Sequence, residues 1–107
     1  MRATVRASAG NCVLAVSGRI TIDSAPDLRT LLLQHLAIPN CESLTLDFSE
    51  VVYVDTSALA VLLEALKGAR RLKKAFRLSG LRERPRYLFE ATRLLHLFDH
   101  VANEIPS

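Results

Sequence analysis

Three consecutive polar residues near the middle of the chain, Asp55, Thr56 and Ser57, have the types and spacing to do chemistry at the start of a helix. Apolar residues recur after them at the helical period, at Leu59, Leu62, Leu63, Leu66 and Ala69. Asp55 or Thr56 can cap the free backbone N–H groups of this helix, which places Ser57 in the first turn, near the positive end of the helix dipole. Such a position favours a phosphoryl group. From the residues alone a purely structural cap is the more common case, because Ser and Thr are preferred at helix starts for capping.

A strand is expected to deliver the chain to this trio. Leu44, Leu46 and Phe48 alternate with Thr45 and Asp47 at the strand period. The stretch from 44 to 68 therefore predicts a strand, a short turn that carries the polar trio, and an amphipathic helix.

The segment from 46 to 71 resembles the signature of STAS domains, the fold shared by anti-sigma factor antagonists and the cytoplasmic tails of sulphate transporters. In that family an apolar strand ends in Asp, and after a linker the sequence Asp-Ser/Thr-Ser/Thr-Gly-Leu opens a helix. The matching residues here are Asp47, Asp55, Thr56, Ser57, Ala58 and Leu59. The resemblance implies that Ser57 is the phosphoacceptor, with Thr56 as the second choice.

Two further features of the site follow from the resemblance. The Gly-x-Ile-x-x-Asp segment at 18–23 is similar to the STAS loop whose Asp lies beside the phosphoacceptor, and that residue is Asp23 here. Ala58 stands where the family has Gly, so its methyl group is expected beside Ser57, where it would hinder a kinase or partner that approaches the backbone closely. The residues expected to shape the site or bind the partner are Asp23, Asp55, Thr56, Ala58 and Leu59.

The N-terminal third predicts a hairpin and a helix. The runs 4–7 and 12–17 alternate at the strand period and are joined around 9–11, which indicates a β-hairpin. Ser24 as N-cap, with Pro26 and Asp27 in the first turn, predicts a helix that runs to about residue 36.

The C-terminal third predicts a strand at 75–79, a helical segment at 81–97 and a last strand at 99–102. The resemblance extends from about residue 12 to residue 101. We therefore expect one STAS domain over residues 1–107, a mixed α/β fold with a central sheet of four to five strands and helices packed mainly on one face.

Composition indicates a small globular protein. The chain has 107 residues, of which 50% are hydrophobic and 23% charged. It contains no apolar run long enough to span a membrane and no signal-peptide pattern, so a cytoplasmic location is expected. Cys12 and Cys41 lack CxxC spacing, which favours two reduced thiols.

Positive charge gathers in the second half of the chain. Residues 57–107 carry ten Lys and Arg against five acidic residues, whereas residues 1–56 carry four against six. The densest block, 67–77, is typical of a solvated helix end, of a surface for an acidic protein or lipid partner, or of a nucleic-acid site. Because it has little aromatic interleaving and no nucleic-acid-binding signature, no nucleic-acid partner is expected.

Enzyme and metal readings have little support. The motifs GxGxxG, P-loop, GxSxG and HExxH are absent, so no catalytic residue and no cofactor are expected. Asp23, Asp47 and Asp55 could converge on a divalent cation, although Asp47 could equally orient its own loop. His96 and His100 stand four apart without an obvious third ligand, and no metal is predicted.

The resemblance implies a non-catalytic interaction switch. An anti-sigma factor antagonist binds an anti-sigma factor Ser kinase, a GHKL-type ATPase, while its Ser is unphosphorylated, and so releases a sigma factor. Phosphorylation ends binding, and a PP2C-type phosphatase restores it. The chain also resembles the STAS subunit of bacterial phospholipid-transporting ABC systems, which docks on the ABC transporter ATPase and in which Thr56 would be the functional hydroxyl. A regulatory circuit with a different phosphatase is a third reading.

Overall fold

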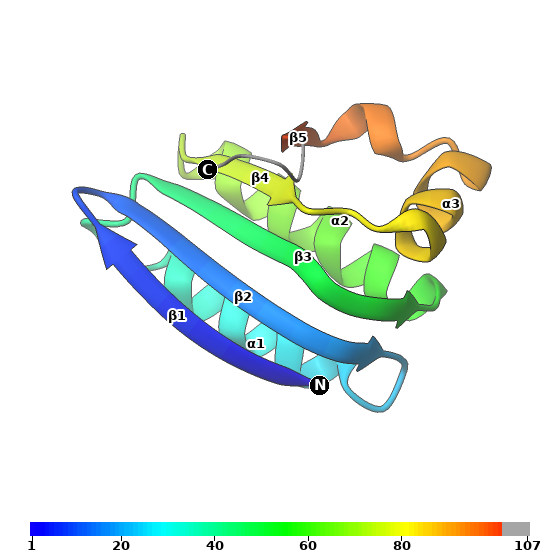
Figure 1. Ribbon diagram of the computed structural model, residues 1–107. Helices are drawn as coiled ribbons and strands as arrows, with labels where there is room; N and C mark the ends of the chain where they lie inside the picture. The colour runs from blue at the N-terminus through cyan, green and yellow to red at the C-terminus, as the bar shows by residue number, and fades with distance from the viewer. Residues whose placement is uncertain (102–107) are drawn as a thin grey trace.

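The computed structural model describes residues 1–101, including every side chain there except those of Ser8 and residues 99–101. The elements in chain order are β1 (Arg2–Ser8), β2 (Asn11–Ile20), α1 (Ala25–Leu36), β3 (Ser43–Val54), α2 (Thr56–Arg71), β4 (Ala75–Ser79), α3 (Glu83–Ala91), the 3₁₀ helix η1 (Leu95–Leu97) and β5 (Asp99–Val101). The five strands form one sheet in sequence order, with β1 antiparallel to β2 and the other neighbours parallel. Helices α1 and α2 lie side by side against one face of the sheet (Figure 1). This architecture confirms the predicted mixed α/β fold.

The predicted N-terminal hairpin is confirmed. Strands β1 and β2 pair from Arg2 opposite Ser17 to Ser8 opposite Asn11. The two residues between them, Ala9 and Gly10, both have positive φ, at 49° and 86°. Two such residues form the primed turn whose twist matches a tight hairpin.

The hydrophobic core fills the space between the sheet and the α1–α2 pair. Leu14, Leu46 and Leu78 lie in register on three neighbouring parallel strands and are fully buried. Leu28 and Leu32 of α1 oppose them with no exposed surface. Burying a leucine contributes about 1.5–3 kcal/mol, so this layer holds α1 against the three parallel strands β2, β3 and β4.

The strand before the polar trio is longer than the sequence predicted. The strand pattern in the sequence covers residues 44–48, and the family signature has a linker between the positions of Asp47 and Asp55. In the structure β3 continues to Val54, which pairs with Ile20 of β2. Two register shifts, between Ala15 and Ser17 and between Gly18 and Arg19, allow the pairing to continue. As a result, α2 begins two residues after the end of a paired strand.

The predicted helix at 81–97 is wrong in length, because the structure divides it into α3 and η1. Helix α3 ends at Ala91, and Arg93 takes a left-handed conformation with φ of 60°. The hydroxyl of Thr92 donates to the carbonyl of Leu88 at 2.7 Å, and such local bonding competes with helix continuation. Phe89 of α3 packs edge-on against Phe48 of β3, which fixes α3 beside the end of the sheet. The predicted last strand is observed over residues 99–101, and residue 102 lies outside the described part.

Candidate functional site

Asp55 caps helix α2. It has an extended backbone between the end of β3 and the first residue of α2, with φ of −113° and ψ of −176°. Its Oδ1 accepts hydrogen bonds from the backbone N–H of Ser57 at 3.0 Å and of Ala58 at 3.4 Å. Of the two capping residues left open by the sequence, the structure therefore selects Asp55, and Thr56 becomes the first helical residue.

The hydroxyl of Ser57 donates to the same carboxylate oxygen of Asp55. Ser57 is half-buried in the first turn of α2. The hydrogen bond from the Ser57 hydroxyl lowers the pKa of Asp55 most; burial raises it, and the backbone N–H groups of Ile22, Ser57 and Ala58 lower it further. Asp55 is consequently ionised at neutral pH. Its carboxylate orients Ser57 by accepting the hydroxyl hydrogen, and its lowered pKa makes that carboxylate a weak base.

Asp55 also holds the loop between β2 and α1. Its Oδ2 accepts from the backbone N–H of Ile22 at 3.0 Å, and its own N–H donates to the carbonyl of Ile20 at 3.1 Å. Asp23 follows Ile22 in this loop and is exposed. The structure therefore brings the loop that carries Asp23 against the start of α2, although the carboxylate of Asp23 has no hydrogen bond or ion pair with any described side chain or backbone group.

Ser24 stabilises this loop instead of capping α1 with its side chain. It occupies the predicted N-cap position, but its hydroxyl makes no bond to the N–H groups of the helix. Its Oγ accepts from the backbone N–H of Thr21 at 3.0 Å. The short loop from Thr21 to Ser24 is thus closed on itself and tied to Asp55.

Comparison with protein families decides the classification. A family model described as "Mlab, STAS domain" matches residues 3–99. The chain belongs to the STAS domain family. The search of curated proteins finds no sequence match.

Solved structures show the same fold at low sequence identity. An anti-sigma factor antagonist from Mycobacterium paratuberculosis superposes with a TM-score of 0.84 at 22% identity, over 92% of this chain and 83% of that one. The phosphorylated form of the Bacillus cell fate determinant SpoIIAA gives 0.72 at 11% identity, over 94% and 91%. A sulfate transporter family protein from Wolinella succinogenes gives 0.73 at 17% identity, over 90% and 82%. In this STAS domain, no helix within residues 1–101 has the length and apolarity to cross a membrane.

The remaining residues predicted for the STAS site differ in accessibility. Thr56 is exposed, whereas Ala58 is fully buried and Leu59 is 3% exposed. The expectation that the Ala58 methyl group would hinder an approaching partner is wrong, because that methyl group points into the core. Ala58 and Leu59 can shape the turn from inside, and Thr56 and Ser57 supply its surface.

Asp47 lies away from the STAS site. It occupies the fifth position of the twelve-residue strand β3, and its Oδ1 accepts from the backbone N–H of Ser49 at 2.9 Å. This local contact matches the reading in which Asp47 orients its own segment. Among the described side chains, no three His, Cys, Asp or Glu residues gather in a way that could hold a metal ion. The side chain of His100 is outside that set.

A groove of about 800 Å³ adjoins the STAS site. One wall comes from the end of β3 and the start of α2, and the other comes from α3. The lining residues are Tyr53, Val54, Asp55, Thr56, Glu83, Arg84, Arg86, Tyr87, Leu88 and Glu90. Tyr53 is held from outside by Arg19, whose guanidinium carbon lies 4.3 Å from the ring centroid. The sequence did not predict the α3 wall, because no local pattern indicates that α3 lies beside Asp55. The available signal was Tyr87, a large aromatic residue with charged residues nearby.

Proposed function

We propose that this STAS domain is an anti-sigma factor antagonist that acts as a phosphorylation-controlled partner switch. It binds an anti-sigma factor Ser kinase, a GHKL-type ATPase, while Ser57 is unphosphorylated. The observation that carries the proposal is the Ser57 hydroxyl, held by Asp55 in the first turn of α2 beside an open groove. SpoIIAA, a fold relative described as an anti-sigma factor antagonist, has been solved in unphosphorylated and phosphorylated forms.

The chemistry at Ser57 is a phosphoryl transfer. The Ser57 Oγ attacks the γ-phosphorus of ATP held by the kinase, the new O–P bond forms, and the bond to ADP breaks. The hydroxyl proton leaves to a base of the kinase or to water, because the lowered pKa of Asp55 makes it a poor proton acceptor. Asp55 instead contributes orientation: by accepting the hydroxyl hydrogen, it directs the serine lone pairs away from itself.

Phosphorylation changes the local electrostatics in two ways. The ester oxygen has no proton to donate, so the hydrogen bond from Ser57 to Asp55 is lost. About two negative charges then lie beside an ionised carboxylate and compete with it for the N–H groups of Ser57 and Ala58. A partner that docks here meets like-charge repulsion and a desolvation cost. A loss of 1.4 kcal/mol already weakens binding about tenfold.

The proposed role needs no catalytic residue in the domain itself and places the protein in the cytoplasm with its kinase. A PP2C-type phosphatase returns Ser57 to the free hydroxyl. Asp23 and Thr56 are the exposed residues expected to contact the partner, and the α3 wall of the groove extends the same surface.

Affinity capture from the native cells tests this proposal. Tagged wild type and its Ser57→Asp, Ser57→Ala and Thr56→Ala variants are compared, with mass spectrometry of the captured proteins and of residue 57. We expect wild type and Ser57→Ala to retain a kinase-like ATPase, Ser57→Asp to lose it, and phosphate to occur on Ser57 of the wild type. Equal capture by wild type and Ser57→Asp would refute the switch.

A second candidate is the STAS subunit of a bacterial phospholipid-transporting ABC system, which would bind the ABC transporter ATPase. The observations in its favour are the match of residues 3–99 to the family model described as "Mlab, STAS domain" and the exposure of the Thr56 side chain to solvent. In that case the same capture would recover a transporter ATPase with both wild type and Ser57→Asp, residue 57 would be unmodified, and Thr56→Asp would abolish binding.

A further inference from the structure

A cluster of cations surrounds the C-terminal end of α2. Lys67, Arg70 and Arg71 are spaced three and four residues apart, so they share one exposed face of the last helical turns. Lys73 follows in the left-handed turn to β4, with φ of 59°. Leu72, between Arg71 and Lys73, is 50% exposed. We call these five residues the basic end.

The cations of the basic end have no carboxylate partner among the described side chains. The ion pairs within that part of the chain are Arg29–Glu64 and Arg86–Glu90, and neither includes a residue of the basic end. Lys74 differs: its Nζ donates to the carbonyls of Leu36 and Ile38 at 2.5 Å and 2.7 Å, so its charge serves the end of α1. The basic end therefore presents charge that no described carboxylate neutralises.

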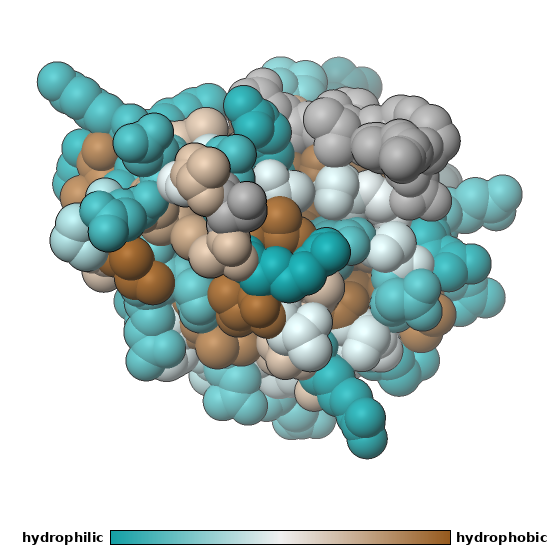
Figure 2. Space-filling view, turned by 60° about the vertical axis from the view of Figure 1, so that its left-hand side comes forward, coloured by the Kyte–Doolittle hydropathy of each residue, from teal (hydrophilic) through white to brown (hydrophobic). Residues whose placement is uncertain are grey.

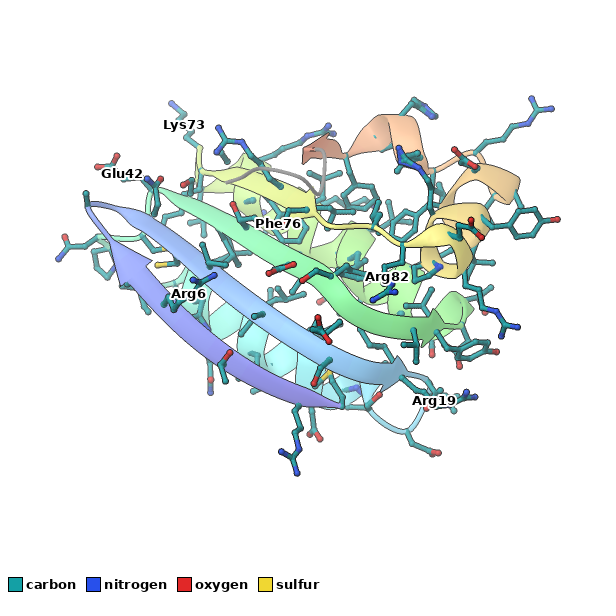
Figure 3. The ribbon with its side chains drawn as sticks, in the orientation of Figure 1. Arg6, Arg19, Glu42, Lys73, Phe76 and Arg82 are labelled. Carbon is teal, nitrogen blue, oxygen red and sulfur yellow. The ribbon has the colours of Figure 1, made fainter. Side chains whose placement is uncertain are left out.

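The basic end lies far from the Ser57 turn. Helix α2 has 16 residues, which corresponds to about 24 Å between its two ends. Figure 3 shows Lys73 and Arg19 at opposite ends of the molecule, and Arg19 contacts Tyr53 in the groove beside the Ser57 turn. In Figure 2 the side of the molecule that lies on the left of Figure 1 faces the viewer. Most of this surface is hydrophilic, and hydrophobic residues are exposed between the hydrophilic ones. A ligand at the basic end can thus bind without covering Ser57 and the first turn of α2.

The chemistry of the basic end selects one class of ligand. Residues 67–75 contain no aromatic side chain, whereas single-stranded nucleic acids are held by aromatic stacking in addition to charge. Leu72 is an exposed apolar side chain surrounded by cations, which suits a surface with anions outside and hydrocarbon beneath. A membrane of anionic phospholipids has both properties, and it attracts clustered Lys and Arg at its surface.

We propose that the basic end docks on the anionic headgroups of a phospholipid membrane, with Leu72 entering the interfacial layer. The contact is peripheral and electrostatic, so it weakens as salt rises. It leaves the Ser57 turn directed away from the membrane, and it does not depend on whether Ser57 is phosphorylated.

Vesicle co-sedimentation of the full chain tests the proposal. Wild type is incubated with neutral phosphatidylcholine vesicles and with vesicles that contain phosphatidylglycerol, at low and physiological salt. The variant Arg70→Gln/Arg71→Gln is compared with Arg2→Gln/Arg6→Gln, which removes the same charge from exposed positions of β1. Leu72→Ser removes the apolar side chain without changing charge. All substituted positions are exposed, and the unfolding midpoint of each variant confirms that the fold is kept.

We expect wild type to bind anionic vesicles and not neutral ones. Each cation near such a surface contributes about fivefold in affinity, so Arg70→Gln/Arg71→Gln should bind about 25-fold more weakly, while the β1 variant stays close to wild type. Leu72→Ser should weaken binding at unchanged net charge. Equal losses in the two double variants would overturn the proposal, because net charge alone would then explain binding. Tighter binding to duplex DNA or RNA than to anionic vesicles, unaffected by Leu72→Ser, would overturn it in favour of a nucleic-acid site.

Discussion

Asp55 and Ile22 are joined by a hydrogen bond of 3.0 Å from the Ile22 backbone N–H to the Asp55 carboxylate, across 33 positions of the chain. The other carboxylate oxygen receives the N–H and hydroxyl groups of Ser57. One side chain therefore couples the β2–α1 loop to the first turn of α2. Asp55 thereby gives a direct hydrogen-bonded path from Ser57 to the loop that carries Asp23.

Replacing Asp55 tests this coupling through its pH dependence. Asp55→Asn removes the charge and turns one acceptor into a donor, so we expect a loss of about 1 kcal/mol in the free energy of unfolding at pH 7. The folded-state pKa of Asp55 is lowered, so its contribution is complete above about pH 4, the ordinary aspartate range, and is lost as pH falls through the lowered pKa. Wild type and Asp55→Asn should therefore converge in acid. Urea titrations between pH 2.5 and 7 measure this, with Asp23→Asn as a control that changes little; a constant gap at all pH values would contradict the assignment.

The isosteric pair Ser57→Asp and Ser57→Asn separates charge from shape at the phosphoacceptor position. Ser57→Asp puts a second carboxylate beside Asp55, partly offset by the N-terminus of α2, and we expect it to be less stable than Ser57→Asn by about 1 kcal/mol at low salt. The difference should shrink in high salt, because charge repulsion is screened. Urea unfolding at two ionic strengths measures it. If Ser57→Asp is as stable as Ser57→Asn in low salt, the two carboxylates are not close neighbours.

Gly80 ends β4 at a point where no side chain fits. Its φ is 67°, and a Cβ there would lie 2.9 Å from the backbone nitrogen and 3.0 Å from the Cα of Ser49. Gly80→Ala should cost about 2–4 kcal/mol, from the left-handed strain together with displacement of β3. Gly10→Ala is the matched control, since Gly10 has φ of 86° but its nearest neighbours would lie 3.5 Å away, and about 1 kcal/mol is expected. Denaturant midpoints of the two variants give the comparison, and equal losses would show that the contact with Ser49 is unimportant.

Cys41 should be unreactive in the folded protein. Burial, and next the neighbouring thiol of Cys12, raise its pKa to about 11. At pH 8 this lowers the thiolate fraction more than about 100-fold relative to an ordinary cysteine. Iodoacetamide should therefore modify Cys41 at least that much more slowly in buffer than in urea, as followed by peptide mass spectrometry. Rapid modification in buffer would show that the loop before β3 opens readily.

Local patterns predicted most of the elements because they depend on neighbours in the chain. The helix ending at Leu36 and the strand from Ala75 to Ser79 have the expected bounds. The hairpin turns at Ala9 and Gly10 as expected, but both of its strands are longer than the alternating runs predicted. The errors occur where contacts distant in sequence compete with local preference. Residues 49–54 join β3 because β2 offers them backbone partners, and the helix at 81–97 stops where the Thr92 hydroxyl and the left-handed Arg93 end it.

The sequence by itself determined the Asp55-Thr56-Ser57 trio, its place at a helix start and the family resemblance, because capping and periodicity are properties of adjacent residues. Only the tertiary structure decided that Asp55 is the cap, that it also binds Ile22, that the Ala58 methyl group is buried, and that α3 forms the second wall of the groove. Each of these depends on which segments the parallel sheet and its core bring together, since burial and hydrogen bonding across 30 or more residues are set by the packing of β2, β3 and α2 rather than by local sequence.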